Sequence, residues 1–247
     1  MSENQIIKTS LPLKDLIIFS EFLKEIRYKN RFFLDDASEK FCNNIIKYAK
    51  MFKTREFIKG EQFYRARIYE FNSSAHFSID VMSAPPPEKA THGRLNPVGI
   101  PYLYLANNSN TAIAEVRPWV GCNITIAKFV LNRTITLINF SSALSLEELN
   151  KMNFEKYEGA ELTWRELISW LFSAPFDPRD DTAYMATQYL AEKIKKEGFD
   201  GILYDSALAS GGYNIALFDK NNASADKLYK ASVKRISYEN EILDIKD

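Results

Sequence analysis

Residues that would build a metal site or a disulfide framework are scarce in this sequence. Its 247 residues include 2 cysteines and 2 histidines. No CxxC pair and no cluster of histidine with cysteine occurs. This scarcity argues against a structural zinc site and against a disulfide-stapled fold, so we expect no bound metal. Isolated cysteines are typical of a reducing compartment, so we expect a cytoplasmic protein.

An excess of one charge and long apolar runs are missing too. The 32 basic residues balance the 32 acidic ones, so the chain has no global attraction to nucleic acid or to an anionic membrane. No apolar run approaches the ~18–20 residues that span a bilayer. The first residues lack the basic and apolar regions of a signal peptide. We therefore expect neither a nucleic acid nor a membrane as a partner.

The chain does have the composition of an ordinary globular protein, with 46% hydrophobic and 26% charged residues. Apolar residues at helical spacing predict a helical N-terminal extension over 1–59. Beyond it, short runs of β-formers alternate with helical segments, the longest of which is expected within 141–197. This pattern predicts an α+β domain over 60–220 with mixed or antiparallel sheets. A tail over 221–247 follows and is expected to hold an edge strand.

Three local expectations are specific enough to compare with a structure. The segments 123–131 and 134–140 both alternate in polarity and flank a short turn, which predicts that they pair as a hairpin. A short helix is expected over 108–117, with Ser109 or Asn110 as its N-cap and Pro118 after its end. The edge strand of the tail is expected over 233–239.

The loop from 84 to 101 is rich in restricted backbone positions. It holds 5 of the 9 prolines and 2 of the 9 glycines of the chain. Arg94 lies between Gly93, which permits unusual backbone angles, and Pro97, which keeps its predecessor extended. Such a loop can present a guanidinium to a phosphate, which its planar fork binds bidentately. The alternative is a turn with an exposed arginine.

Arg65 and Tyr104 are further candidates, each on an expected strand. Arg65 lies in FYRAR, and an arginine that points inward from a strand needs an anionic partner. Tyr104 lies in YLYLA, where it shares one face with Tyr102 and could stack against a flat ring. Each residue also has a plain interpretation, as a solvent-facing arginine or as part of an amphipathic edge strand.

Glu115 is an acid in an unusual setting. It ends a short helix of small apolar residues, where the helix dipole disfavours a negative charge. Such an acid can serve chemistry, or it can form an ion pair with Arg94 or Arg117. Ser206 and Asn214 bracket the loop ALASGG. Ser206 has no GxSxG context and no nearby histidine, so a serine-hydrolase elbow is unsupported.

Taken together, FYRAR, GRLNPVGIPYLYLA, AIAEVRP, GILYDSA and YNIALF resemble the RES domain family over about residues 60–220. The best-known members of this family are toxins paired with Xre-type antitoxins. The family often has tryptophan where this chain has Leu95. The resemblance implies an ADP-ribosyltransferase-like fold and attack on NAD⁺ at the nicotinamide–ribose bond. The functional residues of the family fall on Arg65, Arg94, Tyr104, Glu115 and Ser206.

On this resemblance NAD⁺ is the substrate, inorganic phosphate is a potential co-substrate, and no other cofactor is expected. Glycosidases need two carboxyl groups, because their alkoxide leaving group must be protonated. The nicotinamide of NAD⁺ is cationic and departs as a neutral base, so one carboxylate suffices. We assign catalysis to Glu115 with Tyr104 and Arg94. Binding of NAD⁺ is assigned to Arg65, Arg94, Tyr104, Ser206 and Asn214.

Three functions stay open on the sequence alone. The first is hydrolysis or phosphorolysis of NAD⁺ by a toxin that depletes it. The second is transfer of ADP-ribose to a macromolecule, and the third is a non-catalytic module that binds a nucleotide or a protein. A toxin requires a neutralising partner, and an Xre-type antitoxin would be a separate protein, because no helix-turn-helix region is evident in this chain. A homodimer is the default expectation for a soluble enzyme.

Overall fold

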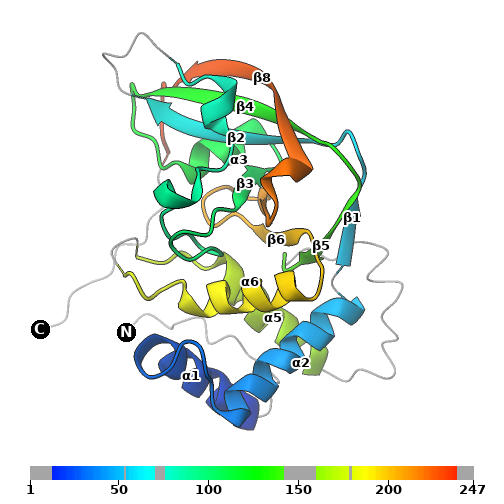
Figure 1. Ribbon diagram of the computed structural model, residues 1–247. Coiled ribbons are helices and arrows are strands. Elements are labelled where there is room, and N and C mark those ends of the chain that lie inside the picture. Colours follow the sequence, from blue (N-terminus) through cyan, green and yellow to red (C-terminus); the bar gives the residue numbers. More distant parts are fainter. Residues whose placement is uncertain (1–12, 53, 70–75, 142–159, 178–179, 238–247) are drawn as a thin grey trace, which may run out of the picture.

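The computed structural model describes residues 13–52, 54–69, 76–141, 160–177 and 180–237. These residues form an eight-stranded sheet with helices packed against it (Figure 1). The strand order is β1-β5-β6-β7-β3-β2-β4-β8, and each neighbouring pair is antiparallel except β5 with β6. The expected α+β class with a mixed sheet is therefore confirmed. The strands are β1 (Thr54–Phe57), β2 (Gln62–Tyr69), β3 (Leu103–Ala106), β4 (Asn123–Leu131), β5 (Ile135–Asn139), β6 (Gly201–Asp205), β7 (Tyr213–Leu217) and β8 (Ala223–Ser232).

Five α-helices are described, and most of them cover one part of the sheet. In Figure 1, α1, α2, α5 and α6 lie together on one side of β5 and β6, whereas α3 lies beside β2 and β3. None of the described helices has the length and apolar character needed to cross a bilayer. The helices are α1 (Leu13–Tyr28), α2 (Asp36–Phe52), α3 (Ser109–Glu115), α5 (Ala160–Ser173) and α6 (Met185–Lys196).

Alternating strand residues build an apolar layer on each face of the sheet. Ile138 and Ile202 pack with buried residues of α1, α2, α5 and α6. Their sequence neighbours Leu137 and Leu203 pack on the opposite face with Met82, which belongs to the 3-10 turn Ile79–Met82. This period of two is what a strand buried on both faces requires. The central strands are therefore packed on both faces and can hold the side chains and loops at their ends in place.

The N-terminal helices share a core with α5 and α6. Glu39 of α2 accepts a hydrogen bond from the Tyr189 hydroxyl at 2.6 Å and is paired with Lys193, both of α6. These contacts lower the pKa of the Glu39 carboxyl below its ordinary value. A second pair joins Lys50 to Glu197 at 2.5 Å. The division of the chain into an extension, a domain and a tail stays a prediction.

The expected hairpin of 123–131 with 134–140 is wrong. β4 pairs with β2 and β8, whereas β5 pairs with β1 and β6. The two strands are consecutive in sequence but lie near opposite ends of the sheet. The alternating pattern correctly predicted two strands, but alternation does not specify which strands pair.

Two further local expectations are corrected. Asn108, not Ser109 or Asn110, caps α3: its side chain accepts a hydrogen bond from the Thr111 N–H at 2.9 Å. The edge strand is β8, which ends at Ser232, and the described residues 233–237 contain no strand. β8 was missed because it pairs only with β4 and is half exposed, so it carries few apolar residues.

The helical segment expected within 141–197 contains α5 and α6. Gly198 has φ +88, as expected of a residue that follows a helix C-terminus. Residues 142–159 of that expected segment lie outside the described residues.

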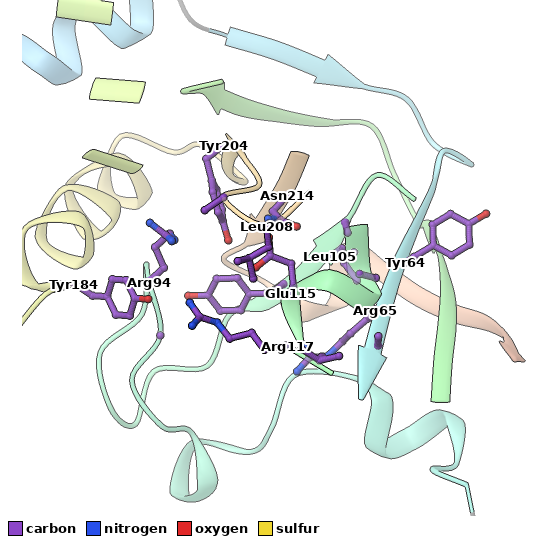
Figure 2. Close-up of a pocket in the computed structure, with 17 residues that line it drawn as sticks. Tyr64, Arg65, Arg94, Leu105, Glu115, Arg117, Tyr184, Tyr204, Leu208 and Asn214 are labelled. Atoms are coloured by element: carbon purple, nitrogen blue, oxygen red, sulfur yellow. The ribbon is translucent and has the colours of Figure 1, made fainter. Parts of the chain in front are cut away.

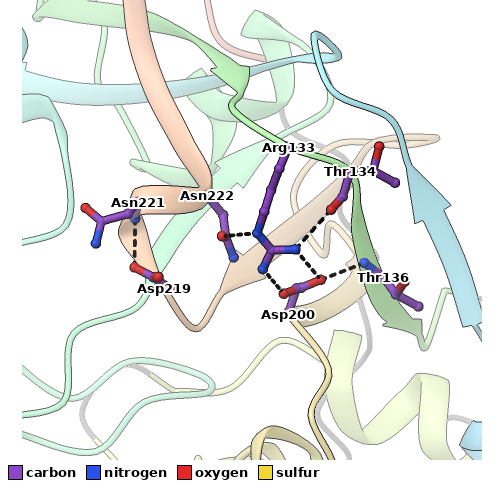
Figure 3. A network of polar contacts seen from close by, with 7 residues as sticks. All are labelled: Arg133, Thr134, Thr136, Asp200, Asp219, Asn221 and Asn222. Carbon is purple, nitrogen blue, oxygen red and sulfur yellow. Dashed lines mark hydrogen bonds and ion pairs between the residues drawn. The ribbon is translucent and has the colours of Figure 1, made fainter.

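A polar network fixes the turn after β4 to the loop before β6 (Figure 3). The Arg133 guanidinium pairs with the Asp200 carboxylate, and its Nε donates to Asn222 Oδ1 at 3.0 Å. Asp200 Oδ2 also accepts the Thr136 N–H at 2.8 Å. The network therefore joins β5, β6 and the 3-10 turn Lys220–Asn222 at the point where β4 and β5 diverge.

Replacement of Asp200 by alanine removes the acceptor for both Arg133 and the Thr136 N–H. We expect the free energy of unfolding to fall by about 1–3 kcal/mol, because two donors lose their partner. Urea denaturation measures this change. The control is Glu21→Ala, which breaks an exposed pair with Lys24 at 2.9 Å and should leave the unfolding midpoint nearly unchanged. Equal losses in the two variants would contradict the structural role of the network.

Candidate active site

A cavity of about 340 Å³ opens between β2, β3, α3 and the loops at 93–94 and 207–208. This volume is within the range of small-molecule sites. Figure 2 shows arginine, tyrosine and carboxylate side chains converging on it. The described residues contain no group of three or more His, Cys, Asp or Glu that could hold a metal ion. The lining residues that carry polar side chains are Tyr64, Arg65, Arg94, Tyr104, Glu115, Arg117, Tyr184, Tyr204 and Asn214.

The Glu115 carboxylate is held by two hydrogen bonds to one of its oxygens. Oε1 accepts from the Ser206 hydroxyl at 2.6 Å and from Asn214 Nδ2 at 2.7 Å. The Ser206 hydroxyl in turn accepts the N–H groups of Leu208 and Ala209, each at 3.1 Å. Its oxygen is thus occupied as an acceptor, which directs its proton toward Glu115. No donor among the described residues reaches Oε2, so that oxygen is available to a ligand.

Close packing places Glu115 at this point. α3 is short, and its position depends on the Asn108 cap and on the buried residues Thr111 and Ala112. Gly212, in the loop between β6 and β7, lies against this helix: a Cβ there would come within 2.3 Å of Thr111 Oγ1. Because only glycine allows this approach, the loop that carries Ser206 can lie beside the end of α3.

Arg65 projects from β2 into the cavity. Its Nη1 atom is buried and has no hydrogen-bond partner among the described residues. Burial, with a smaller effect from neighbouring Arg67, lowers the pKa of Arg65 to about 10. The guanidinium is therefore still charged at neutral pH. A buried charge without a partner is costly, so this position favours an anionic ligand.

The loop that carries Arg94 is fixed by hydrogen bonds from β3. The Tyr104 hydroxyl donates to Asn96 Oδ1 at 2.8 Å and accepts the Leu95 N–H at 3.0 Å. A Cβ at Gly93 would come within 2.5 Å of Asn96 Oδ1 and 3.0 Å of the Tyr104 hydroxyl, so glycine is required there. The hydroxyl of Tyr104 is thus engaged in holding the loop, and its ring is the part that borders the cavity.

Helix α6 holds the same loop from the other side. Gln188 Nε2 donates to the Gly93 carbonyl at 2.8 Å and to the Asn96 carbonyl at 3.1 Å. The Thr187 hydroxyl donates to the Arg94 carbonyl. Sequence analysis did not identify these two positioning residues, because their spacing on α6 carries no motif.

Arg94 has both a structural contact and an open face. Its Nη1 donates to the carbonyls of Phe172 and Ala174 at the end of α5, each at 2.9 Å. Its guanidinium carbon lies 5.3 Å from the centre of the Tyr184 ring and 5.8 Å from that of Tyr204. One nitrogen of the Arg94 guanidinium therefore fixes the end of α5. The same guanidinium also borders the cavity, where it lies among aromatic rings.

Buried tyrosines in the cavity wall are neutral. Burial raises the pKa of both Tyr104 and Tyr204 above the ordinary value of a tyrosine. Their hydroxyls therefore stay protonated at physiological pH and cannot serve as general bases. Glu115 is the one carboxylate among the lining residues.

The sequence-predicted site residues come together in the structure. Five of the six line the cavity: Arg65, Arg94, Tyr104, Glu115 and Asn214. The sixth, Ser206, reaches it through its hydrogen bond to Glu115. Within the described part of the chain, Glu115 pairs with neither Arg94 nor Arg117, so that interpretation of the acid is wrong. Arg117, Tyr184 and Tyr204 also line the cavity and were not predicted as site residues.

The Tyr104 hydroxyl offers a test of how the loop is held. In Tyr104→Phe the ring remains, but the Leu95 N–H and Asn96 Oδ1 lose their partner. We expect the free energy of unfolding to fall by about 1–3 kcal/mol, measured by urea denaturation. The control Tyr229→Phe alters a half-exposed tyrosine of the edge strand β8 and should leave stability unchanged. A Tyr104→Phe protein as stable as the wild type would contradict this role.

Known proteins resemble the chain to different degrees. No curated protein matches it. Among solved structures it is similar to a chain of the "Crystal structure of the M.tuberculosis MbcT-MbcA toxin-antitoxin complex", with 12% identity and a TM-score of 0.42. That alignment covers 76% of this chain and 92% of the other. The family model described as RES domain matches residues 62–239, well over half of the chain. This protein therefore belongs to the RES domain family.

Proposed function

We propose that the protein cleaves NAD⁺ at its nicotinamide–ribose bond. The observation that carries the proposal is the Glu115 carboxylate, which lines the cavity and is fixed through one oxygen by Ser206 and Asn214, with no donor among the described residues at the other. The unpartnered Arg65 supports an anionic substrate. Membership of the RES domain family, whose best-known members are toxins, supports a role in depleting cellular NAD⁺.

One fixed carboxylate matches the chemistry of this bond. When the bond between the ribose C1′ and the nicotinamide nitrogen breaks, its electron pair passes to the cationic ring and nicotinamide leaves neutral. No acid is needed to protonate it, unlike the leaving group of an ordinary glycoside. The ribose becomes an oxocarbenium-like cation. Glu115 stabilises that charge because its orientation is already set before the reaction.

The other residues bind and orient the dinucleotide. Arg65 binds the pyrophosphate, and the open face of Arg94 provides a second positive charge. Tyr104 and Tyr204 are neutral aromatic walls against which the nicotinamide ring can stack. Holding the ribose against Glu115 lowers the barrier further through positioning.

The acceptor for the ribosyl cation defines the reaction class. Attack by water gives ADP-ribose and releases a proton. Attack by inorganic phosphate gives the 1-phosphate of ADP-ribose. The lining residues support a nucleotide ligand but identify neither acceptor. A toxin of this kind would be neutralised by a separate Xre-type antitoxin.

Incubation of the purified protein with NAD⁺, with and without phosphate, tests the proposal by liquid chromatography. We expect the wild type to release nicotinamide and Glu115→Gln to do so about 100-fold or more slowly, because the developing charge loses its counter-ion. The matched control is Glu56→Gln, which makes the same chemical change on the exposed edge strand β1 and should keep full activity. Equal rates for Glu115→Gln and the wild type would overturn the proposal.

Arg65 should contribute to substrate binding and lower the stability of the folded protein. In Arg65→Met the buried, unpartnered charge is gone, so we expect the melting temperature to stay level or rise. Affinity for NAD⁺ should fall about 10-fold to 100-fold, measured by calorimetry with Glu115→Gln also present to prevent turnover.

Arg67→Met is the control for Arg65→Met. Arg67 lies two residues further along β2, where its Nη1 donates to the Val81 carbonyl at 2.6 Å and its guanidinium lies 4.3 Å from the centre of the Phe77 ring. This variant should lose stability and keep its affinity for NAD⁺. The opposite pattern in the two variants would contradict the assignment of Arg65.

A further inference from the structure

We propose that Arg117 is a further anion-binding residue of the cavity, beside Arg65 and Arg94, and that it contacts the pyrophosphate of a nucleotide at the cavity mouth. The inference rests on the proposed function in taking a dinucleotide as the physiological ligand. Arg117 lies two residues after Glu115, lines the cavity and is exposed to solvent. It would thus bind the outer part of a ligand whose ribose lies at Glu115.

The backbone at Arg117 is in an uncommon conformation. Its φ of +48 is the only positive φ of a non-glycine residue in the described ranges. Its N–H donates to the Ala114 carbonyl at 2.9 Å, which closes the end of α3, and Pro118 follows. Non-glycine residues adopt this region at a cost, and such costs are concentrated at functional sites. A role for its side chain would explain why the position holds arginine and not glycine.

The guanidinium of Arg117 is free to bind a ligand. No described residue forms a hydrogen bond, an ion pair or a ring contact with it, and Glu115 uses Ser206 and Asn214 instead. Arg94, by contrast, is held by two carbonyls. In Figure 2 the Arg117 side chain extends from the end of α3 toward the side of the cavity where Arg94 and Tyr184 lie.

The charge of the cavity supports the same ligand. Three arginines line it, Arg65, Arg94 and Arg117, against the single carboxylate of Glu115. The surplus of positive charge matches the two negative charges of a pyrophosphate group. Arg65 enters from β2 and Arg117 from the end of α3, so the two charges reach the cavity from different elements (Figure 2).

Calorimetry with ADP, adenosine and inorganic phosphate tests the proposal without requiring turnover. The main variant is Arg117→Asn, because asparagine tolerates a positive φ and has no charge. We expect its affinity for ADP to fall about 10-fold to 100-fold, with the affinity for adenosine and the melting temperature unchanged. Arg117→Lys keeps the charge and should recover much of the ADP affinity. Arg117→Gly, which relieves the backbone, should lose it like Arg117→Asn.

Each contrary result has a distinct meaning. Equal ADP affinity in Arg117→Asn and the wild type would overturn the proposal, as would equal losses for ADP and adenosine. Loss of inorganic phosphate binding alone would assign Arg117 to a free phosphate and overturn its role with the dinucleotide. A wild type that fails to bind ADP would also overturn it. A wild type that binds ADP through Arg117 but leaves NAD⁺ intact would overturn the proposed function while supporting this site.

Discussion

Two hydrogen bonds to one oxygen of Glu115 join α3 to two consecutive strands that lie more than ninety residues later in the sequence. The carboxylate ends α3, the serine follows β6, and the asparagine lies on β7. Because β6 and β7 are buried central strands, the side chains of Ser206 and Asn214 are held in place, and they hold the carboxylate in turn. The close approach of Gly212 to α3 and the Asn108 cap both serve this juxtaposition. A single acid can therefore be oriented without a second carboxylate or a metal ligand set nearby.

The arginines described above divide between structural roles and roles at the cavity. Arg67 and Arg133 are satisfied by carbonyls, a ring or a carboxylate, and they hold loops in place. Arg94 combines both roles. Arg65 and Arg117 have no such partners among the described residues, one because it is enclosed and the other because it faces solvent. A buried charge without a partner, such as that of Arg65, favours a ligand that is itself charged.

The sequence predicted the candidate site better than it predicted the connections of the sheet. A residue that is energetically unfavourable in its local setting, such as Glu115 at the end of an apolar helix, could be recognised from the sequence as a candidate site residue. Strand pairing could not, since β4 and β5 follow each other but separate through the Arg133 turn. Arg117 and Gln188 were missed for a related reason. Arg117 stands out only by its backbone angle, which the sequence does not show. Gln188 acts through a hydrogen bond to a loop about ninety residues earlier in the chain.

The most direct test of the account is a crystal structure of Glu115→Gln with NAD⁺ bound. The account predicts that the nicotinamide ribose lies against residue 115, with Ser206 and Asn214 still hydrogen-bonded to that side chain. It also predicts a phosphate oxygen within hydrogen-bond distance of Arg65 Nη1. A dinucleotide bound outside this cavity, or one with its adenosine end at residue 115, would contradict it.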